Sequence, residues 1–119
     1  MVARFEDGKG HDLLESIADN MTDWSVHLCG FGPRPPRISR SNIQIYQTDN
    51  PFHVLSRTKI FLSLQRFNNY PSQSLLEAMA SGCAVIATDV GETRTLLDDT
   101  CAILVPYNSL DLLNAVKKL

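Results

Sequence analysis

The sequence has 119 residues, of which 44% are hydrophobic and 20% charged, with 13 acidic and 11 basic side chains. This length fits a single domain, and the composition is that of an ordinary soluble folded protein rather than a disordered chain. The formal net charge of −2 argues against a broad nucleic-acid-binding surface, and no apolar run is long enough to span a bilayer.

Short apolar runs alternate with helical patterns along the whole chain. The runs predict six strands, at residues 2–5, 24–29, 43–46, 60–64, 84–87 and 102–105. Between and after them the pattern predicts helices at residues 11–20, 51–57, 71–82 and 91–97, and a last helix capped by Ser109.

Six strands alternating with helices predict an α/β fold with a doubly wound parallel six-stranded sheet. If the strand order is 3-2-1-4-5-6, the first and fourth strands are neighbours, and the loops after them leave in opposite directions. Ligands of such sheets bind in that crevice, outside the carboxyl ends of the strands. We therefore expect a site where residues 6–10 and residues 65–72 meet.

The first of these segments carries two cations. Arg4 lies near the end of the first predicted strand, and Lys9 comes just before a predicted helix. Two cations beside the positive end of a helix dipole can cradle a diphosphate. Taken alone, the same residues also fit solvated surface charges.

The second segment leads into the predicted helix at residues 71–82. The backbone amides of Ser72 and Gln73 are unpaired in its first turn and can accept an anion. Glu77 lies more than a turn inside the helix, where its carboxylate can accept two hydrogen bonds from a vicinal diol such as a ribose. A solvated helix face is the alternative interpretation of Glu77.

Other chemistries have little support in the sequence. No Walker A loop, dinucleotide-binding glycine motif, nucleophile elbow or zinc signature is present, so we predict neither a metal nor another cofactor. Cys29, Cys83 and Cys101 lie far apart among apolar residues, which predicts reduced, buried thiols. Because the first residues also lack a signal-peptide pattern, we expect a cytoplasmic protein.

The segment from Leu75 to Gly91, LLEAMASGCAVIATDVG, resembles the donor-binding domain of the retaining GT-B glycosyltransferases of group 1. Arg4, followed five residues later by Lys9 and then by Gly10, matches the Arg-x4-Lys-Gly diphosphate motif of that family. Two shorter family motifs are also present, Gly-x-Gly-Pro at residues 30–33 and Leu-Val-Pro at residues 104–106. The matches run in family order over nearly the whole chain.

The resemblance implies a Rossmann-like half of a GT-B fold and a sugar-transfer reaction. A sugar would move from a nucleoside diphosphate sugar to an acceptor hydroxyl, with its anomeric configuration retained. The resemblance implies that Arg4, Lys9 and the amides near Ser72 and Gln73 stabilise charge on the departing diphosphate, without a metal. It also implies that Glu77 contacts the nucleotide ribose.

One family position differs in this sequence. The family pattern has two glutamates separated by seven residues; the second is Glu77, and the first falls on Asn69. In the family, the first carboxylate holds hydroxyls of the donor sugar. Asparagine keeps one acceptor and adds two donors, but it removes the charge. The resemblance thus assigns catalytic roles to Arg4, Lys9 and Asn69.

The resemblance also implies how the chain is organised and what it works with. Residues 1–119 correspond to the nucleotide-sugar-binding domain, a fragment without the N-terminal acceptor domain of such enzymes and inactive alone. The partners implied are a nucleoside diphosphate sugar and, through the missing domain, a glycan or lipid-linked acceptor, with no nucleic acid. A role in polysaccharide biosynthesis and peripheral membrane association of the longer enzyme are consistent with these partners.

Two alternatives remain open at this stage. A phospho-acceptor receiver domain has a similar length, with the acids Glu6 and Asp7 after the first strand and Asp49 after the third. Against it, the fifth strand ends in Thr88 and Asp89, with no lysine at that place. A non-catalytic transferase remnant is the second alternative. It is motivated by Asn69 and by the missing half.

Overall fold

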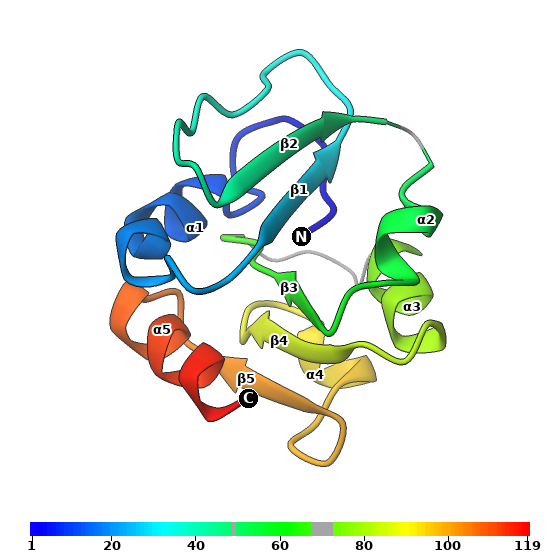
Figure 1. Ribbon diagram of the computed structural model, residues 1–119. Coiled ribbons are helices and arrows are strands. Elements are labelled where there is room, and N and C mark those ends of the chain that lie inside the picture. The colour runs from blue at the N-terminus through cyan, green and yellow to red at the C-terminus, as the bar shows by residue number, and fades with distance from the viewer. Residues whose placement is uncertain (49, 68–72) are drawn as a thin grey trace.

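The computed structural model describes residues 1–48, 50–67 and 73–119. Strands and helices alternate along these residues, and the strands pair in parallel (Figure 1), which confirms the predicted α/β class. The strands are β1 (Val26–Gly30), β2 (Ile43–Gln47), β3 (Ile60–Ser63), β4 (Ala84–Thr88) and β5 (Ala102–Val105). The helices are α1 (His11–Ile17), continued by a 3-10 turn (Ala18–Asn20), then α2 (Phe52–Leu55), α3 (Gln73–Ala80), α4 (Thr93–Leu96) and α5 (Ser109–Lys118).

The described strands form two sheets where the sequence predicts one. β1 pairs with β2, and β3, β4 and β5 form a second sheet in that order. The predicted first strand makes an isolated bridge between Val2 and Cys29 of β1, and the Ala3 amide donates to the Cys29 carbonyl at 3.0 Å. The order within each sheet agrees with the expected order, but this segment is not a sixth sheet strand, and no ladder among the described residues joins it to β3. The chain turns at Glu6, so the segment pairs with β1 over only a few residues.

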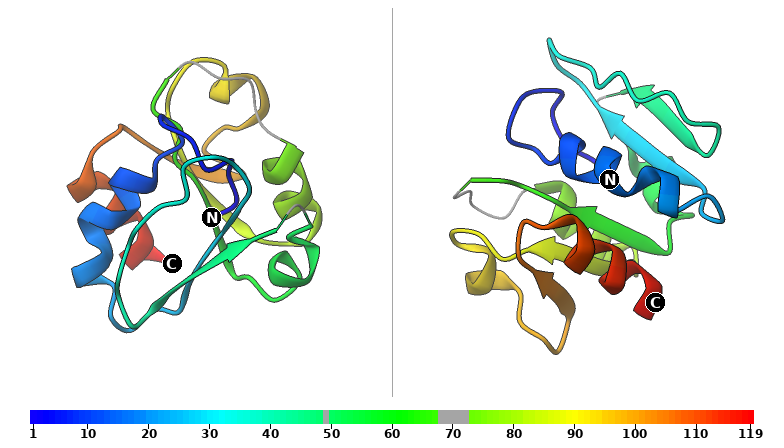
Figure 2. Two further views of the ribbon diagram at one scale, coloured as in Figure 1. Left: turned by 90° about the horizontal axis from the view of Figure 1, so that it is seen from above. Right: turned by 90° about the vertical axis from the view of Figure 1, so that its left-hand side faces the viewer.

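The helices cover two opposite faces of the strands (Figure 2). α1 and α5 lie together on one side, and α2 and α3 lie on the other. Because side chains alternate along a strand, Val85 and Ala87 of β4 pack into the core under α2 and α3, whereas Ile86 packs into the core under α1 and α5. Two cores on two faces are what a doubly wound parallel sheet requires.

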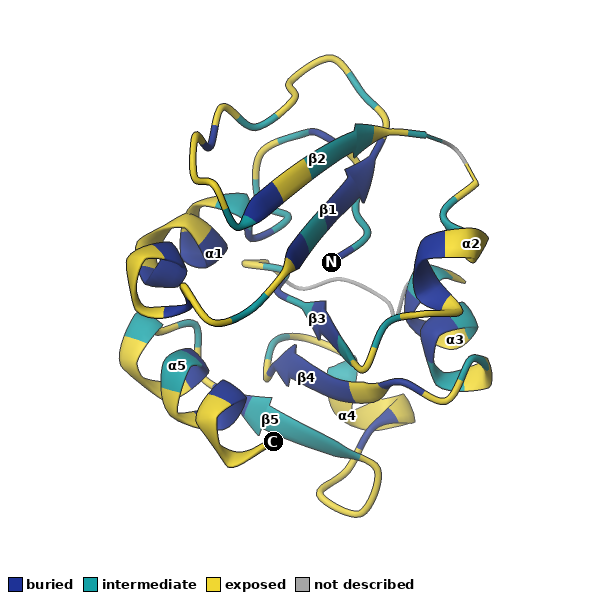
Figure 3. Ribbon diagram, in the orientation of Figure 1, coloured by how far each residue is buried: buried dark blue, intermediate teal, exposed yellow. Residues whose placement is uncertain are grey.

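Burial follows this layered arrangement (Figure 3). β1 and β4 are buried over most of their length, and the helices place their buried residues towards the strands. The wholly apolar run at residues 84–87 therefore does what its sequence predicts, since it forms the middle strand of the larger sheet. No helix in the described part of the chain is both long and apolar enough to cross a bilayer.

The cap of the last helix differs by one residue from the sequence expectation. The side chain of Asn108, rather than that of Ser109, accepts hydrogen bonds from the amides of Leu110 and Asp111. Asn108 has the extended backbone of a cap residue, and its oxygen satisfies amides that the first turn leaves unpaired. The Ser109 hydroxyl instead lies 2.7 Å from the hydroxyl of Ser16 on α1.

Candidate functional site

The two segments expected to form the site meet at the carboxyl ends of the strands. The Arg66 amide, just beyond β3, donates a hydrogen bond to the Gly8 carbonyl at 2.9 Å. The ring of Phe67 lies against Gly8 as well. Nearby, the Ser74 hydroxyl on α3 donates to the carbonyl of Val2 at 3.3 Å. The loop after the first segment and the elements after β3 thus form one contiguous edge.

Gly10 allows this close approach. Its φ of 94° lies in the left-handed region, and a Cβ at this position would overlap the carbonyl oxygen of Leu64. Gly10 also precedes α1, whose Leu14 amide donates to the Gly10 carbonyl at 3.1 Å. The glycine that follows Lys9 is therefore required by the backbone geometry, because other residues are strained at this φ and would collide with Leu64, directly after β3.

The two predicted cations share one carboxylate. Arg4 Nε lies 3.2 Å from Oε2 of Glu6, and Lys9 Nζ lies 3.7 Å from Oε1 of the same residue. The Arg4 side chain is 63% exposed and that of Lys9 is 21% exposed. The structure thus brings Arg4 and Lys9 to the same carboxylate, as one cluster with a formal charge of +1.

A second ion pair holds the same loop to the turn after β1. Asp7 pairs with the guanidinium of Arg34, and the Arg34 amide donates to the Phe5 carbonyl at 2.9 Å. The Phe5 amide in turn donates to the Phe31 carbonyl at 3.1 Å. The Gly-x-Gly-Pro turn therefore supports the loop that carries Lys9.

On α3, the structure brings two predicted residues together. The side-chain amide of Gln73 donates to Oε1 of Glu77 at 3.2 Å, one turn further along the helix. Glu77 is half-buried, and its backbone carbonyl accepts from the Ser81 hydroxyl at 2.8 Å. The predictions for Asn69 and Ser72 fall outside the described residues, as does that for Asp49 in the receiver alternative.

Aromatic residues that we did not predict as part of the site also lie at this edge. The Arg66 guanidinium stacks over the rings of Phe67 and Tyr107, 5.7 and 5.8 Å from their centroids. The Tyr107 hydroxyl donates to Asp12 at 2.6 Å; burial and this carboxylate raise the Tyr107 pKa. Arg66 falls within the predicted segment, but its contact with Tyr107, far along the chain, has no signal in the sequence.

His11, at the start of α1, is a second feature that the sequence did not mark. Its ring packs edge-on against Phe5, and its Nε2 atom is buried without a hydrogen-bond partner. Burial lowers the pKa of His11 below its ordinary value of 6.5, despite the neighbouring Asp12 carboxylate. The neutral imidazole is therefore the form that this packing favours.

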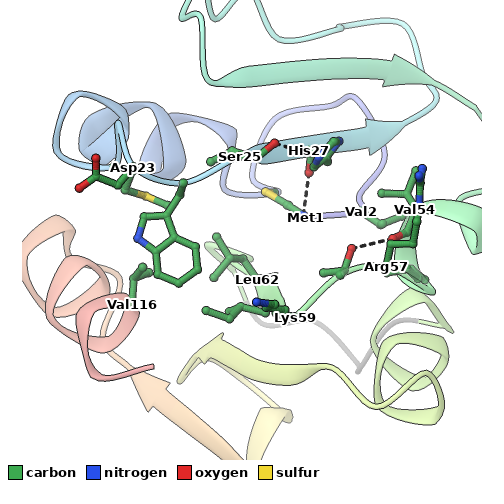
Figure 4. Close-up of a pocket in the computed structure, with 16 residues that line it drawn as sticks. Met1, Val2, Asp23, Ser25, His27, Val54, Arg57, Lys59, Leu62 and Val116 are labelled. Carbon is green, nitrogen blue, oxygen red and sulfur yellow. Dashed lines mark hydrogen bonds between the residues drawn. The ribbon is translucent and has the colours of Figure 1, made fainter.

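A large cavity lies at the amino ends of the strands, opposite the candidate site. It has a volume of about 620 Å³ and opens between the starts of β1 and β3 (Figure 4). Its walls come from the N-terminal segment, β1 and the loop before it, α2, β3 and α5: Met1, Val2, Met21, Asp23, Trp24, Ser25, Val26, His27, Val54, Leu55, Arg57, Thr58, Lys59, Ile60, Leu62 and Val116. Because ligands of parallel α/β sheets bind at the carboxyl ends, this position separates the cavity from the candidate site.

The amino group of Met1 lies in this region. It donates a hydrogen bond to the His27 carbonyl at 2.9 Å, as Figure 4 shows. Burial lowers the pKa of this amino group from its ordinary value of 8.0 to about 6, although the fields of Cys29 and Cys83 act in the opposite direction. In the 119-residue chain by itself, the folded state therefore favours the neutral amine near pH 7.

The thiols partly follow the sequence expectation. Cys29 and Cys83 are buried and free, whereas Cys101 is free but exposed, contrary to the prediction that it is buried. Cys101 lies at the turn before β5, where the apolar flanks belong to the strand rather than to the turn. Within residues 1–48, 50–67 and 73–119, no three His, Cys, Asp or Glu side chains form a group that could hold a metal ion.

Comparisons with known proteins identify the family of the chain and structures with a similar fold. The family model described as "Glycosyl transferases group 1" matches residues 1–119. None of the curated proteins gives a significant match to the sequence. Among solved structures, a glycosyltransferase from Rickettsia africae ESF-5 superposes with a TM-score of 0.78 at 19% identity, covering 99% of this chain and 36% of that one.

Two further structures superpose equally well. HepE from Anabaena, solved in complex with UDP, has a TM-score of 0.78 at 15% identity and covers 98% of this chain and 37% of its own. A sucrose-phosphate synthase from Thermosynechococcus elongatus has a TM-score of 0.78 at 21% identity, with 98% and 35% covered. The chain thus spans about a third of the length of these structures.

Proposed function

The chain belongs to the group 1 glycosyltransferases, and we propose that it is the part of such an enzyme that binds a nucleoside diphosphate sugar. Its fold is the Rossmann-like half of a GT-B glycosyltransferase, as the resemblance predicts. The family match decides against the receiver alternative. In this proposal, residues 1–119 form the donor-binding domain of a longer enzyme whose acceptor site lies in its other half.

The observation that carries the proposal is the meeting of two segments at one edge. The loop with Arg4 and Lys9 lies beside the residues that follow β3, through the hydrogen bond between Arg66 and Gly8. α3, which carries Glu77, approaches the same N-terminal segment through its contact with Val2. Cations on one side and a carboxylate on the other suit a ligand with a diphosphate at one end and hydroxyl groups at the other.

The residues of the proposed site have distinct proposed roles. Arg4 and Lys9 bind the diphosphate and stabilise the negative charge that grows on it as the bond to the sugar breaks. Glu77 accepts hydrogen bonds from the ribose hydroxyls; its carboxylate keeps free acceptor positions beside the bond from Gln73. The backbone amides at Gln73 and Ser72 are proposed to contact the diphosphate as well. The sugar is proposed to keep its anomeric configuration during transfer.

Asn69 is proposed to contact the donor sugar in place of the family glutamate. An amide can hydrogen-bond to sugar hydroxyls, but it cannot supply the negative charge of a carboxylate. If Asn69 limits catalysis, Asn69→Glu in the longer enzyme should raise donor turnover. Unchanged turnover in that variant, together with intact donor binding, would instead support the non-catalytic remnant.

The remaining parts of the proposal concern the longer enzyme. Its acceptor is proposed to be a glycan or a lipid-linked glycan, used in polysaccharide biosynthesis on the cytoplasmic side of a membrane. The UDP in the HepE structure supports a nucleoside diphosphate as the probe for this chain. We expect the chain alone to bind such a ligand without transferring a sugar, because closure and acceptor positioning come from the other half.

Calorimetric titration with UDP and with GDP tests the proposed function. We expect Arg4→Ala/Lys9→Ala to weaken the binding of the better ligand about tenfold or more, since it removes charge-assisted hydrogen bonds to the diphosphate. Lys117→Ala/Lys118→Ala is the matched control, because it removes the same charge from the exposed end of α5. Equal affinities for the wild type and the Arg4/Lys9 variant would overturn the diphosphate assignment.

A further inference from the structure

Glu6 lies between the two cations of the proposed diphosphate site. Its two carboxylate oxygens are divided between them, with Oε2 at 3.2 Å from Arg4 Nε and Oε1 at 3.7 Å from Lys9 Nζ. The carboxylate thus bridges a guanidinium and an ammonium, as a small bound anion does. It comes from the same short loop, two residues after Arg4 and three before Lys9.

The neighbouring acid does not share this position. Asp7 pairs with Arg34, on the side of the loop that faces the turn after β1. Among the described residues, Glu6 is the acid recorded within ion-pair distance of Arg4 and of Lys9. Its side chain is 40% exposed, so it can rotate into solvent without leaving a buried charge unpaired.

We propose that the Glu6 carboxylate occupies the place of the diphosphate on Arg4 and Lys9, and that the donor displaces it on binding. This inference rests on the proposed function, because it takes Arg4 and Lys9 as the diphosphate ligands. A carboxylate and a diphosphate compete for the same N–H donors of Arg4 and Lys9, and the negative charges of the two groups repel each other when both lie beside these cations. Glu6 therefore lowers the affinity of the site for diphosphate-containing ligands.

After sugar transfer, the same competition favours release of the nucleoside diphosphate product. The nucleoside diphosphate that remains must leave two cations to which it is strongly attracted. As it leaves, Glu6 returns to Arg4 and Lys9 and neutralises one of their two charges. Glu6 is thus a residue that sets affinity and favours product release, rather than a group that contacts the sugar.

The test is calorimetric titration of the 119-residue chain with UDP and with inorganic pyrophosphate, for the wild type and for Glu6→Gln. We expect Glu6→Gln to bind both probes about 3- to 10-fold more tightly at low salt, because two ion pairs of modest strength no longer compete. The gain should shrink at high salt, where screening weakens interactions between exposed charges. Glu15→Gln is the matched control, because it removes one negative charge from an exposed position on α1.

A double-mutant cycle separates this effect from a general change in charge or stability. In the Arg4→Ala/Lys9→Ala background, Glu6→Gln should give a much smaller gain in affinity, since the competing ion pairs are already absent and only the repulsion between Glu6 and the diphosphate is removed. If Arg4→Ala/Lys9→Ala weakens binding but Glu6→Gln binds equally or more weakly than the wild type, the role of Glu6 is overturned and the diphosphate site stands. If neither Arg4→Ala/Lys9→Ala nor Glu6→Gln changes affinity, or if no variant binds either probe, both proposals fail.

Discussion

The hydroxyl of Thr88, at the end of β4, donates a hydrogen bond to the backbone carbonyl of Gln65 at 2.6 Å. Thr88 is a buried polar side chain with 1% of its surface exposed. Gln65 begins the segment after β3 from which Arg66 reaches the loop at Gly8. The side chain of one strand therefore fixes the path by which the neighbouring strand leaves the sheet and enters the proposed site.

Thr88→Val tests this connection, because it keeps the shape of the side chain and removes the hydrogen-bond donor. We expect the free energy of unfolding to fall by about 1–2 kcal/mol and UDP binding to weaken with it. Urea denaturation followed by circular dichroism measures the first effect, and calorimetry the second. Thr95→Val is the control, since its hydroxyl bonds to Glu92 at an exposed position; an equal cost at both positions would contradict the role given to Thr88.

A comparison of two glycines with positive φ distinguishes the cost of backbone strain from the cost of a steric overlap. Gly10 (φ 94°) faces the Leu64 carbonyl, whereas Gly82 (φ 83°), after α3, has nothing within 4 Å of the Cβ position. We expect Gly10→Ala to cost about 3 kcal/mol or more in the free energy of unfolding, because strain and overlap combine. Gly82→Ala should cost about 1–2 kcal/mol, from strain alone. Chemical denaturation of the two variants gives the comparison, and equal losses would show that the contact with Leu64 can relax.

The cap of α5 gives a test that compares two neighbouring residues. The structure predicts a larger loss of stability at Asn108, and the sequence alone predicts it at Ser109. Asn108→Ala removes the acceptor for two amides and should lower the free energy of unfolding by about 1 kcal/mol. Ser109→Ala removes an exposed contact with Ser16 and should change it by less than about 0.5 kcal/mol. Thermal melts of the two variants check the order, and a larger loss for Ser109→Ala would restore the sequence-based assignment of the cap.

For the 119-residue chain prepared by itself, the buried amino group of Met1 predicts how stability depends on pH. Its pKa is about 6 in the folded chain and 8.0 in its ordinary state, so between these values the unfolded chain binds more protons. The contribution of the neutral amine to the free energy of unfolding should therefore be complete above pH 8. The free energy of unfolding should fall by about 2–3 kcal/mol as the pH decreases to 6. Below about pH 6.5, the ordinary pKa of histidine, the lowered pKa of His11 also makes stability fall as the pH decreases.

Urea denaturation at several pH values between 6 and 8 measures this dependence. An acetylated N-terminus no longer titrates, so the acetylated chain should lose most of the slope between pH 6 and 8. His11→Asn separates the contribution of the histidine at the lower end of the range. A slope that is unchanged by acetylation would show that another group is responsible.

Much of the fold follows from local patterns. The apolar run at residues 84–87 and the helical spacing of residues 11–20 predict elements that the structure contains, with ends shifted by a few residues. The first strand is different, because periodicity indicates an extended segment but not whether it pairs on one side or on both. The cap of α5 was misplaced by one residue, since asparagine and serine are both good caps and only the backbone conformation distinguishes them.

The sequence predicts where the candidate site lies, but not which contacts its residues make. The order of the strands indicated the edge, and the types of residue at positions 4, 9, 73 and 77 indicated a polar ligand. The sequence could not show that Glu6 takes both cations, because a carboxylate so close along the chain can pair with either cation or with none. The stacking of Arg66 on Tyr107 depends on the end of β5 reaching this edge, which no local pattern reports.

Among the described residues, the N-terminal segment pairs with β1 alone, and the strands form two ladders, one of β1 and β2 and one of β3, β4 and β5. Separate ladders can differ in their protection against hydrogen exchange. The proposed site draws Arg4 and Lys9 from beside the first ladder and Glu77 from beside the second. A ligand that binds both stabilises only the state in which they are together. A bound nucleotide would therefore add a noncovalent link between the two ladders, beside the apolar core that Leu28 shares with Leu62 and Ile86, and should raise the protection of both ladders against hydrogen exchange.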